Sequence, residues 1–172
     1  MSNTLIERLW RRVQALISPA RLTLADDSGP VQKLQLKLSQ LQVTDGVPRI
    51  AEYGFVSNPP LGTDCAVLFL AGDRTNGIVV GTNNQTYRMK NLTSGEVAIH
   101  DNNGQIVHLT ATGIRITSSM PVIVDAPLLH CTGSITADGD ISDEGGLKTM
   151  AGMRAAHNGH HHGTSPLPDL IA

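Results

Sequence analysis

Apolar residues near the start of the chain recur every three or four positions. The residues that share this spacing are Leu5, Ile6, Leu9, Trp10, Val13, Leu16 and Ile17. The spacing places side chains on one side of an α-helix, so residues 5–17 are predicted to form a short amphipathic helix that ends before Pro19. Such a helix packs against protein or lies on a membrane surface. Its shortness and a polar side with three arginines favour packing.

From residue 31 the pattern changes to alternation. Leu34, Leu36 and Leu38 alternate with polar residues, which predicts a half-buried strand over residues 31–43. Further short strands are predicted at the apolar runs 50–56, 65–71 and 78–81, which turn residues separate. About five short strands in roughly 70 residues favour a small barrel of the oligonucleotide/oligosaccharide-binding (OB) type.

Beyond Met89 the strands become shorter and more regular. Gly95, Gly104 and Gly113 lie nine residues apart. The predicted strands in this part are residues 96–101, 105–110, 114–117, 121–126, 128–131, 134–137 and 140–142. Narrow apolar faces of this kind are marginal in a monomer, so we expect a β-prism or β-helix built from several chains. Residues 147–156 are predicted to form a short helix, and the last ten residues an irregular tail.

Composition narrows the classes of function. Aromatic residues make up 3% of the chain and the formal net charge is -2, so the basic groove and stacking aromatics of a nucleic-acid-binding protein are not expected. Cys65 and Cys131 lie far apart and predict neither a disulfide framework nor a zinc site. No catalytic motif is found, and no apolar run has the roughly 20 residues of a membrane span.

A cluster of histidines near the end of the chain is the strongest candidate for chemistry. His157, His160, His161 and His162 fall within six positions. Extended backbone turns His160 and His162 to one side and His161 to the other. Three chains around an axis would contribute six imidazoles, an octahedral set that suits iron better than tetrahedral zinc. A solvated histidine-rich loop and the remnant of a tag remain alternatives.

Asp143 is a second candidate ligand. If Ile135, Ala137 and Ile141 face a common axis, Asp143 does so too, and three carboxylates there would repel one another unless protonated or bridged by a cation such as calcium. The alternative is a solvated acidic turn. Two other functions stay open on these residues: an OB-type nucleic-acid or ligand-binding module, and a metal hydrolase built on the histidines.

Several short motifs, taken in order, resemble a known family. They are residues 53–59, 64–70, 72–74 and 77–81, then residues 87–92, 95–98, Asp101 and Gly104, and finally residues 139–143, Met150, residues 153–154, Asn158 and the pair His160 and His162. In this order and spacing the chain resembles the baseplate assembly and central spike proteins of Mu-like contractile-tailed phages. His157 departs from the pattern, since an aromatic residue is expected before the asparagine.

The resemblance implies an all-β, non-enzymatic homotrimer. Residues 1–17 would form an N-terminal helix and residues 18–90 an OB-like barrel that docks to the hub and baseplate proteins of the tail. Residues 91–144 would form an intertwined triangular β-helix (β-prism), and residues 145–172 an apex where His160 and His162 of three chains hold one structural iron ion. The expected place is the virion tail baseplate, with assembly in the host cytoplasm. The expected action is piercing of the host outer membrane.

Overall fold

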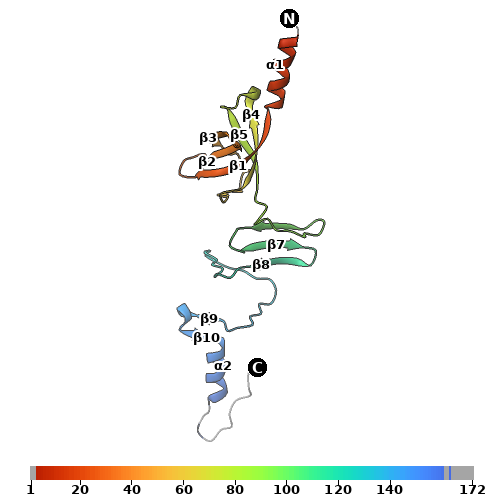
Figure 1. Cartoon of the computed structure of the whole chain (residues 1–172). Coiled ribbons are helices and arrows are strands. Elements are labelled where there is room, and N and C mark those ends of the chain that lie inside the picture. Colours follow the sequence, from red (N-terminus) through yellow and green to blue (C-terminus); the bar gives the residue numbers. More distant parts are fainter. Residues whose placement is uncertain (1–2, 161–162, 164–172) are drawn as a thin grey trace. The chain divides into compact units, whose positions relative to one another are not determined.

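The computed structural model describes residues 3–160 and Gly163. The chain divides into two compact units, Met1–Val122 and Ile123–Ala172. Strands make up most of the regular structure in the described residues, with two α-helices (Figure 1). None of the helices described is long and apolar enough to cross a bilayer. The four-part division predicted from the sequence stays a prediction.

The predicted N-terminal helix is confirmed as α1, Asn3–Gln14. It ends three residues earlier than predicted because the chain turns directly into the first strand, β1, Ile17–Asp26. The backbone N–H of Phe69 donates to the carbonyl of Leu16 over 2.7 Å, which ties this corner to the sheet. β1 was not predicted, because its first residues continue the helical pattern and Pro19 indicated only the end of a helix.

Five strands form the first sheet. They are β1, β2 (Lys33–Ser39), β3 (Gln42–Pro48), β4 (Asp64–Phe69) and β5 (Gly77–Asn83), in the order β3-β2-β1-β4-β5. Each neighbouring pair is antiparallel. The two edges of this order are also joined. Arg49 and Val79 form a parallel bridge, and the N–H of Ile50 donates to the carbonyl of Val79 over 3.0 Å.

Two predicted strands of this region are wrong. Residues 31–43 form part of a hairpin rather than one strand, because the chain reverses at Gln40 and Leu41, where Ser39 pairs with Gln42. Residues 50–56 contain no strand; the chain turns there at Gly54, whose φ of 89° favours glycine. The apolar residues of this loop are exposed rather than half-buried, so they do not alternate between a core and solvent as a strand would.

The core of the first sheet comes from alternate positions of all five strands. It consists of Ala20, Leu22, Leu34, Leu36, Val47, Cys65, Val67, Phe69 and Val79. Phe69 is the largest of these side chains, and it fits because Gly77 on β5 has none. A Cβ at Gly77 would lie 2.9 Å from the Phe69 ring. The core therefore depends on aliphatic residues and one aromatic ring, as the composition indicates.

A second sheet of three strands follows. β6 (Val97–His100), β7 (Ile106–Thr110) and β8 (Gly113–Thr117) pair antiparallel in chain order, which confirms three of the predicted strands. The strands predicted at residues 121–126, 128–131 and 134–137 are not present in this chain. A strand requires a partner for its backbone groups, and within the described residues these segments pair with no other segment.

The second unit contains a small hairpin and a helix. β9 (Ser142–Asp143) and β10 (Lys148–Thr149) flank a 3₁₀ turn, η2, Glu144–Gly146. The predicted helix is confirmed as α2, Met150–Gly159, shifted by three residues at each end. It starts at Met150 because Thr149 is its N-cap, and the side-chain oxygen of Thr149 accepts from the N–H of Gly152 over 2.9 Å.

Candidate functional site

The hairpin and α2 are joined by one carboxylate. Asp140 accepts hydrogen bonds from the hydroxyl of Thr149 and from the backbone N–H groups of Ala151 and Ile141, at 3.0 and 2.9 Å for the two N–H groups. The Thr149 hydroxyl bond, followed by the Ala151 N–H bond, holds the pKa of Asp140 below its usual value. The sequence alone does not single out Asp140. Its structural role depends on a helix that starts ten residues later.

The histidine cluster begins inside α2. His157 lies in the last turn, and His160 ends the helix with φ -77° and ψ 135°, which is extended backbone. The N–H of His160 donates to the carbonyl of His157 over 3.1 Å. His161 and His162 lie outside the described residues, so the predicted pairing of His160 with His162 is not tested. The backbone at His160 does have the extended form that the prediction requires.

One chain does not form a metal site by itself among the described residues. No group of three or more His, Cys, Asp or Glu residues lies close enough there to hold an ion. Imidazole is a suitable ligand for iron, so the donor chemistry of His160 fits the expected ion. His161 and His162 of the same cluster lie outside these residues, so the iron site stays a prediction.

Asp143, the predicted calcium ligand, lies on β9. Its cross-strand partner is Lys148 on β10. Asp143 also borders a cavity of about 480 Å³ whose apolar lining comes from Ile141, Leu147, Met150 and Met153. Nothing tests the binding of calcium here. The cavity shows that Asp143 lies beside an apolar surface and not only in a solvated turn.

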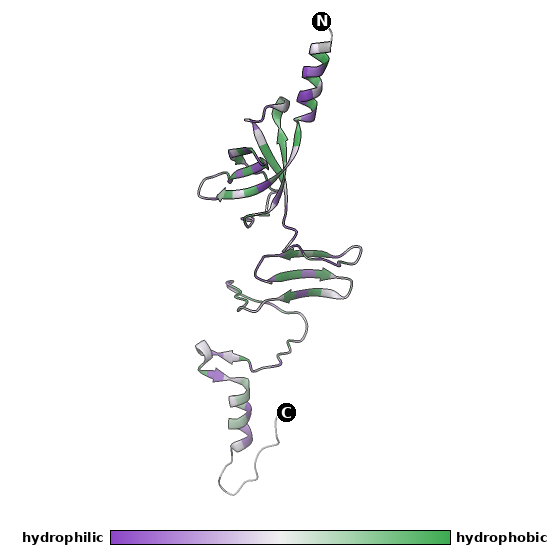
Figure 2. Ribbon diagram, in the orientation of Figure 1, coloured by the Kyte–Doolittle hydropathy of each residue, from purple (hydrophilic) through white to green (hydrophobic). Residues whose placement is uncertain are grey.

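The second sheet has one apolar face that its own chain leaves exposed. In the register of the strands, Val97, Leu109 and Ile114 form one cross-strand row, and Ile99, Val107 and Ile116 form the next. Five of these six side chains are 41–70% exposed, and Val107 is half-buried. Figure 2 shows the apolar character of these strands. An exposed apolar face of this size is typical of an interface between proteins.

The opposite face of this sheet is mostly polar, with Ala98 and Ile106 among its residues. His108 on β7 lies 3.3 Å from the Glu96 carboxylate, and Glu96 also accepts from the N–H of Thr93 over 2.9 Å. Arg115 is the cross-strand neighbour of His108. The two faces of the sheet therefore differ. One carries only the six apolar side chains, and the other carries charged side chains, of which His108 and Glu96 are each 18% exposed.

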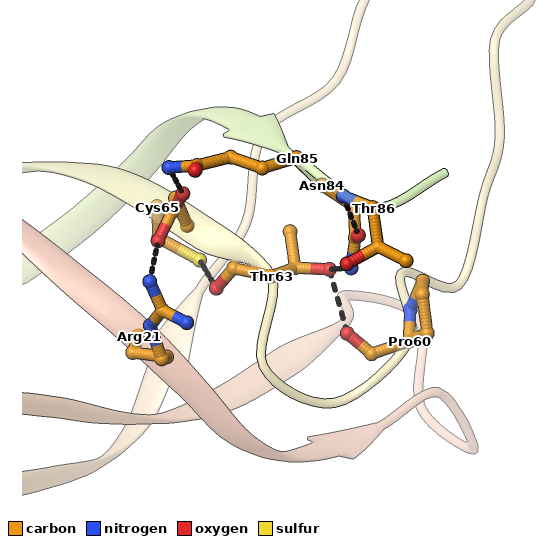
Figure 3. A network of polar contacts seen from close by, with 8 residues as sticks. Arg21, Pro60, Thr63, Cys65, Asn84, Gln85 and Thr86 are labelled. Carbon is orange, nitrogen blue, oxygen red and sulfur yellow. Dashed lines mark hydrogen bonds and ion pairs between the residues drawn. The ribbon is translucent and has the colours of Figure 1, made fainter. Parts of the chain in front are cut away.

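The point where the chain leaves the first sheet is held by Asn84. Its side-chain N–H donates to Thr63 Oγ1 over 3.0 Å, and its side-chain oxygen accepts from the N–H of Thr86 (Figure 3). The same oxygen accepts from the N–H of Tyr87 over 3.3 Å. Thr63 is 1% exposed and donates in turn to the carbonyl of Pro60 over 2.6 Å. One amide thus connects the end of β5 to the loop before β4.

A second set of polar contacts lies beside it. Asp64 at the start of β4 accepts from Arg21 Nη2 over 2.7 Å and from Gln85 Nε2 over 2.6 Å (Figure 3). Arg21 comes from β1 and Gln85 from the residues that follow β5. Neither set was identified from the sequence, because each joins positions more than 20 residues apart and no local pattern marks them.

Arg49 holds the loop between β3 and β4. Its guanidinium donates to the carbonyl of Ser57 over 2.6 Å, to Ser57 Oγ over 2.9 Å and to Gln32 Oε1 over 2.9 Å. The loop carries Tyr53 and Val56, which are 103% and 92% exposed. These contacts join the start of the loop at Arg49 to its middle at Ser57, while its apolar residues remain at the surface.

Comparison with known proteins gives a consistent result. Residues 20–86 match the family "Bacteriophage Mu Gp45, N-terminal". The chain is 30% identical over 147 residues to the baseplate puncturing device gp45 of Escherichia phage Mu, a match that covers 84% of this chain and 75% of that protein. It is 28% identical over 164 residues to the Mu-like prophage FluMu protein gp45 of Haemophilus influenzae, covering 95% and 90% of the two chains.

Proposed function

Because the chain belongs to the bacteriophage Mu Gp45 family, we propose that it is the trimeric central spike of a contractile tail and pierces the host outer membrane. It is a structural protein of the virion tail baseplate and not an enzyme, as the phage Mu relative is a baseplate protein. The proposal adds four features to this role: trimerisation, attachment to a tail hub, the piercing action and a metal ion at the apex.

The first part of the proposal is an OB-type barrel at the base of the spike. The strand order of the first sheet supports it, together with the parallel bridge between Arg49 and Val79. If that bridge closes the sheet, the order around the ring becomes β1-β2-β3-β5-β4. A closed five-stranded ring of this kind is a Greek-key barrel, and closure removes the edges that would otherwise invite aggregation.

The observation that carries the trimer is the uncovered apolar surface beyond β5. It includes the face of β6, β7 and β8 and the residues that follow, among them Ile123, Leu128, Leu129 and Ile135, which are 66–85% exposed. Burying one such side chain contributes about 1.5–3 kcal/mol. No described residue after Val79 is a buried hydrophobic residue. We infer that three chains intertwine here and bury one another's apolar faces in a triangular β-helix.

The apex completes the proposal. His160 and His162 of three chains would supply six imidazoles to one iron ion, which would act as a cross-link where the spike is too narrow for a hydrophobic core. The extended backbone at His160 and the ligand chemistry of imidazole support this assignment. A calcium ion between the three Asp143 carboxylates is a further proposal, supported by the expected parity with Ile141.

Molar mass in solution tests the trimer directly. Multi-angle light scattering of the purified chain is expected to give three times the 18.3 kDa of one chain at micromolar concentration. The apolar faces should then be inaccessible to a dye that binds exposed apolar surface. A folded monomer would contradict the proposal, because it would leave the surface beyond β5 in water.

A further inference from the structure

α1 carries an apolar face that its own chain does not cover. Five large side chains of this helix, each 55–64% exposed, make up the face: Leu5, Ile6, Leu9, Trp10 and Val13. We propose that the α1 helices of three copies pack together through this face as a short parallel bundle at the N-terminal end of the spike. The inference rests on the proposed trimer and adds an interface to it.

The shape of the face fits two neighbours better than one. At 100° per residue, the five side chains spread over an arc of roughly 140°, wider than the narrow seam of a two-stranded coiled coil. No charged residue falls within the arc. Arg8 lies on the opposite side, where Glu7 and Arg11 form a pair at 4.0 Å. The charges of Glu7, Arg8 and Arg11 would therefore stay in water when the apolar arc is buried between two other helices. Arg12 lies at the edge of the arc, about 20° beyond Leu5, where its long side chain can extend to water.

The size of the face favours copies of the same chain over a separate partner. α1 has 12 residues, a length at which an isolated helix is marginal in water. A face of five side chains is also smaller than the roughly 800 Å² per partner of a stable interface. Three helices already joined through the rest of the trimer meet at an effective concentration near the millimolar range, which compensates for the small area. A partner that diffuses freely lacks this advantage.

The direction of α1 is also set by the fold. The end of the helix packs against the 3₁₀ turn η1 (Leu70–Gly72), where a Cβ at Gly72 would lie 2.6 Å from the carbonyl oxygen of Arg12. Just beyond the helix, the hydrogen bond between Phe69 and Leu16 joins the chain to β4. Three copies related by a three-fold axis would thus present α1 in the same orientation, as a parallel bundle requires.

Trp10 is the one tryptophan of the chain and reports on the face directly. We would compare the full-length protein with Leu9→Gln, which places an amide in the arc, and with Arg8→Gln, a matched control on the opposite side. In the unmodified trimer and in Arg8→Gln, Trp10 should emit at short wavelength, and acrylamide should quench it at least threefold less than in Leu9→Gln. All three proteins should keep the mass of three chains.

Cross-linking adds a second measurement. In a Cys131→Ser background, Val13→Cys should give covalent dimers between chains on mild oxidation, because the substituted positions meet near the axis. Cys65 should not interfere, because it is buried and burial raises the pKa of its thiol.

The outcomes separate the bundle from the trimer. A trimer in which acrylamide quenches Trp10 as strongly as in Leu9→Gln, or in which Val13→Cys forms no interchain disulfide, would overturn the bundle and leave the spike intact. Protection of Trp10 that appears only with phosphatidylglycerol-containing vesicles would overturn it in favour of a lipid surface. A monomeric mass would remove the proposed function and the bundle together.

Discussion

At the scale of single residues, Asn84 determines the path of the chain as it leaves the first sheet. Asn84→Ala removes the acceptor for the N–H groups of Thr86 and Tyr87 and the donor to Thr63. Losing such contacts costs about 1–2 kcal/mol locally, so we expect amide hydrogen exchange over residues 84–88 to become about tenfold faster. Mass spectrometry of the peptides measures this. Asn102→Ala, in an exposed turn, is the control, and equal rates in both variants would contradict the role of Asn84.

Asp140 makes the attachment of α2 dependent on pH. Its pKa is lowered in the folded chain, chiefly by the Thr149 hydroxyl, so this contribution to stability is complete above the ordinary value near 3.8 and is lost as the pH falls through the lowered pKa. NMR titration of the Asp140 carboxyl group should give a midpoint below 3.8. Thr149→Val should raise that midpoint, since it removes the largest cause. An unchanged midpoint would show that the hydroxyl does not set the pKa.

These residues also show what a sequence can predict at this scale. His160, His162 and Asp143 were selected because their spacing is local, and alternation along extended backbone needs only neighbouring positions. Asn84, Thr63, Arg49 and Asp140 were not selected. Their roles arise from contacts between segments that come together only in the folded chain. Each is a polar residue that no local sequence pattern marks.

At the scale of elements, strong local periodicity was enough to predict helices and strands from the sequence. α1, β6, β7 and β8 were predicted because several apolar residues repeat at one period within each, and α2 because residues 147–156 are compatible with a helix. β1 was missed because the helical pattern runs into it. The turn at Gln40 and Leu41 was missed because Leu41 and Val43 are again alternate apolar residues, although Leu41 is 99% exposed. The predicted ends of helices and strands were wrong where tertiary contacts, and not the local pattern, decide where a segment pairs.

The two faces of the second sheet lead to a prediction at the same scale. Ile116 and Thr117 are adjacent on β8, both exposed, and point to opposite faces. Ile116→Glu would place three carboxylates inside the proposed trimer, so we expect loss of the trimeric mass at micromolar concentration, measured by light scattering. Thr117→Glu should leave the mass unchanged. If the two substitutions had the same effect, the apolar face would not be the interface.

At the scale of the whole molecule, burial is distributed unevenly along the chain. Among the described residues every buried hydrophobic side chain lies between Ala20 and Val79, although exposed apolar residues continue through Met153. A base with its own core can fold as one chain. The part beyond it carries many apolar residues, and within the described part of the chain those from Ile123 to Ile135 remain exposed. We expect its stability to depend on assembly, as in other chains whose units bury their faces only against neighbours.

The proposed apex gives the last prediction. Two ligands from each of three chains close an octahedral shell, so iron should bind with one ion per trimer and serve as a structural cross-link. His160→Ala and His162→Ala should each remove the metal, measured by elemental analysis of the purified protein. The trimeric mass should persist in both variants, because the apolar faces of the stalk remain buried.

His161→Ala is the matched control, since it removes an imidazole from the same short segment. An extended backbone would turn residue 161 away from its two neighbours, so we expect this variant to keep a full complement of iron. Three results are therefore distinguishable. Loss of iron in the His160 and His162 variants alone supports the pair of ligands. Equal loss in all three variants would indicate a loosely bound ion shared among the histidines, and full retention in the His160 or His162 variant would show that the ion lies elsewhere.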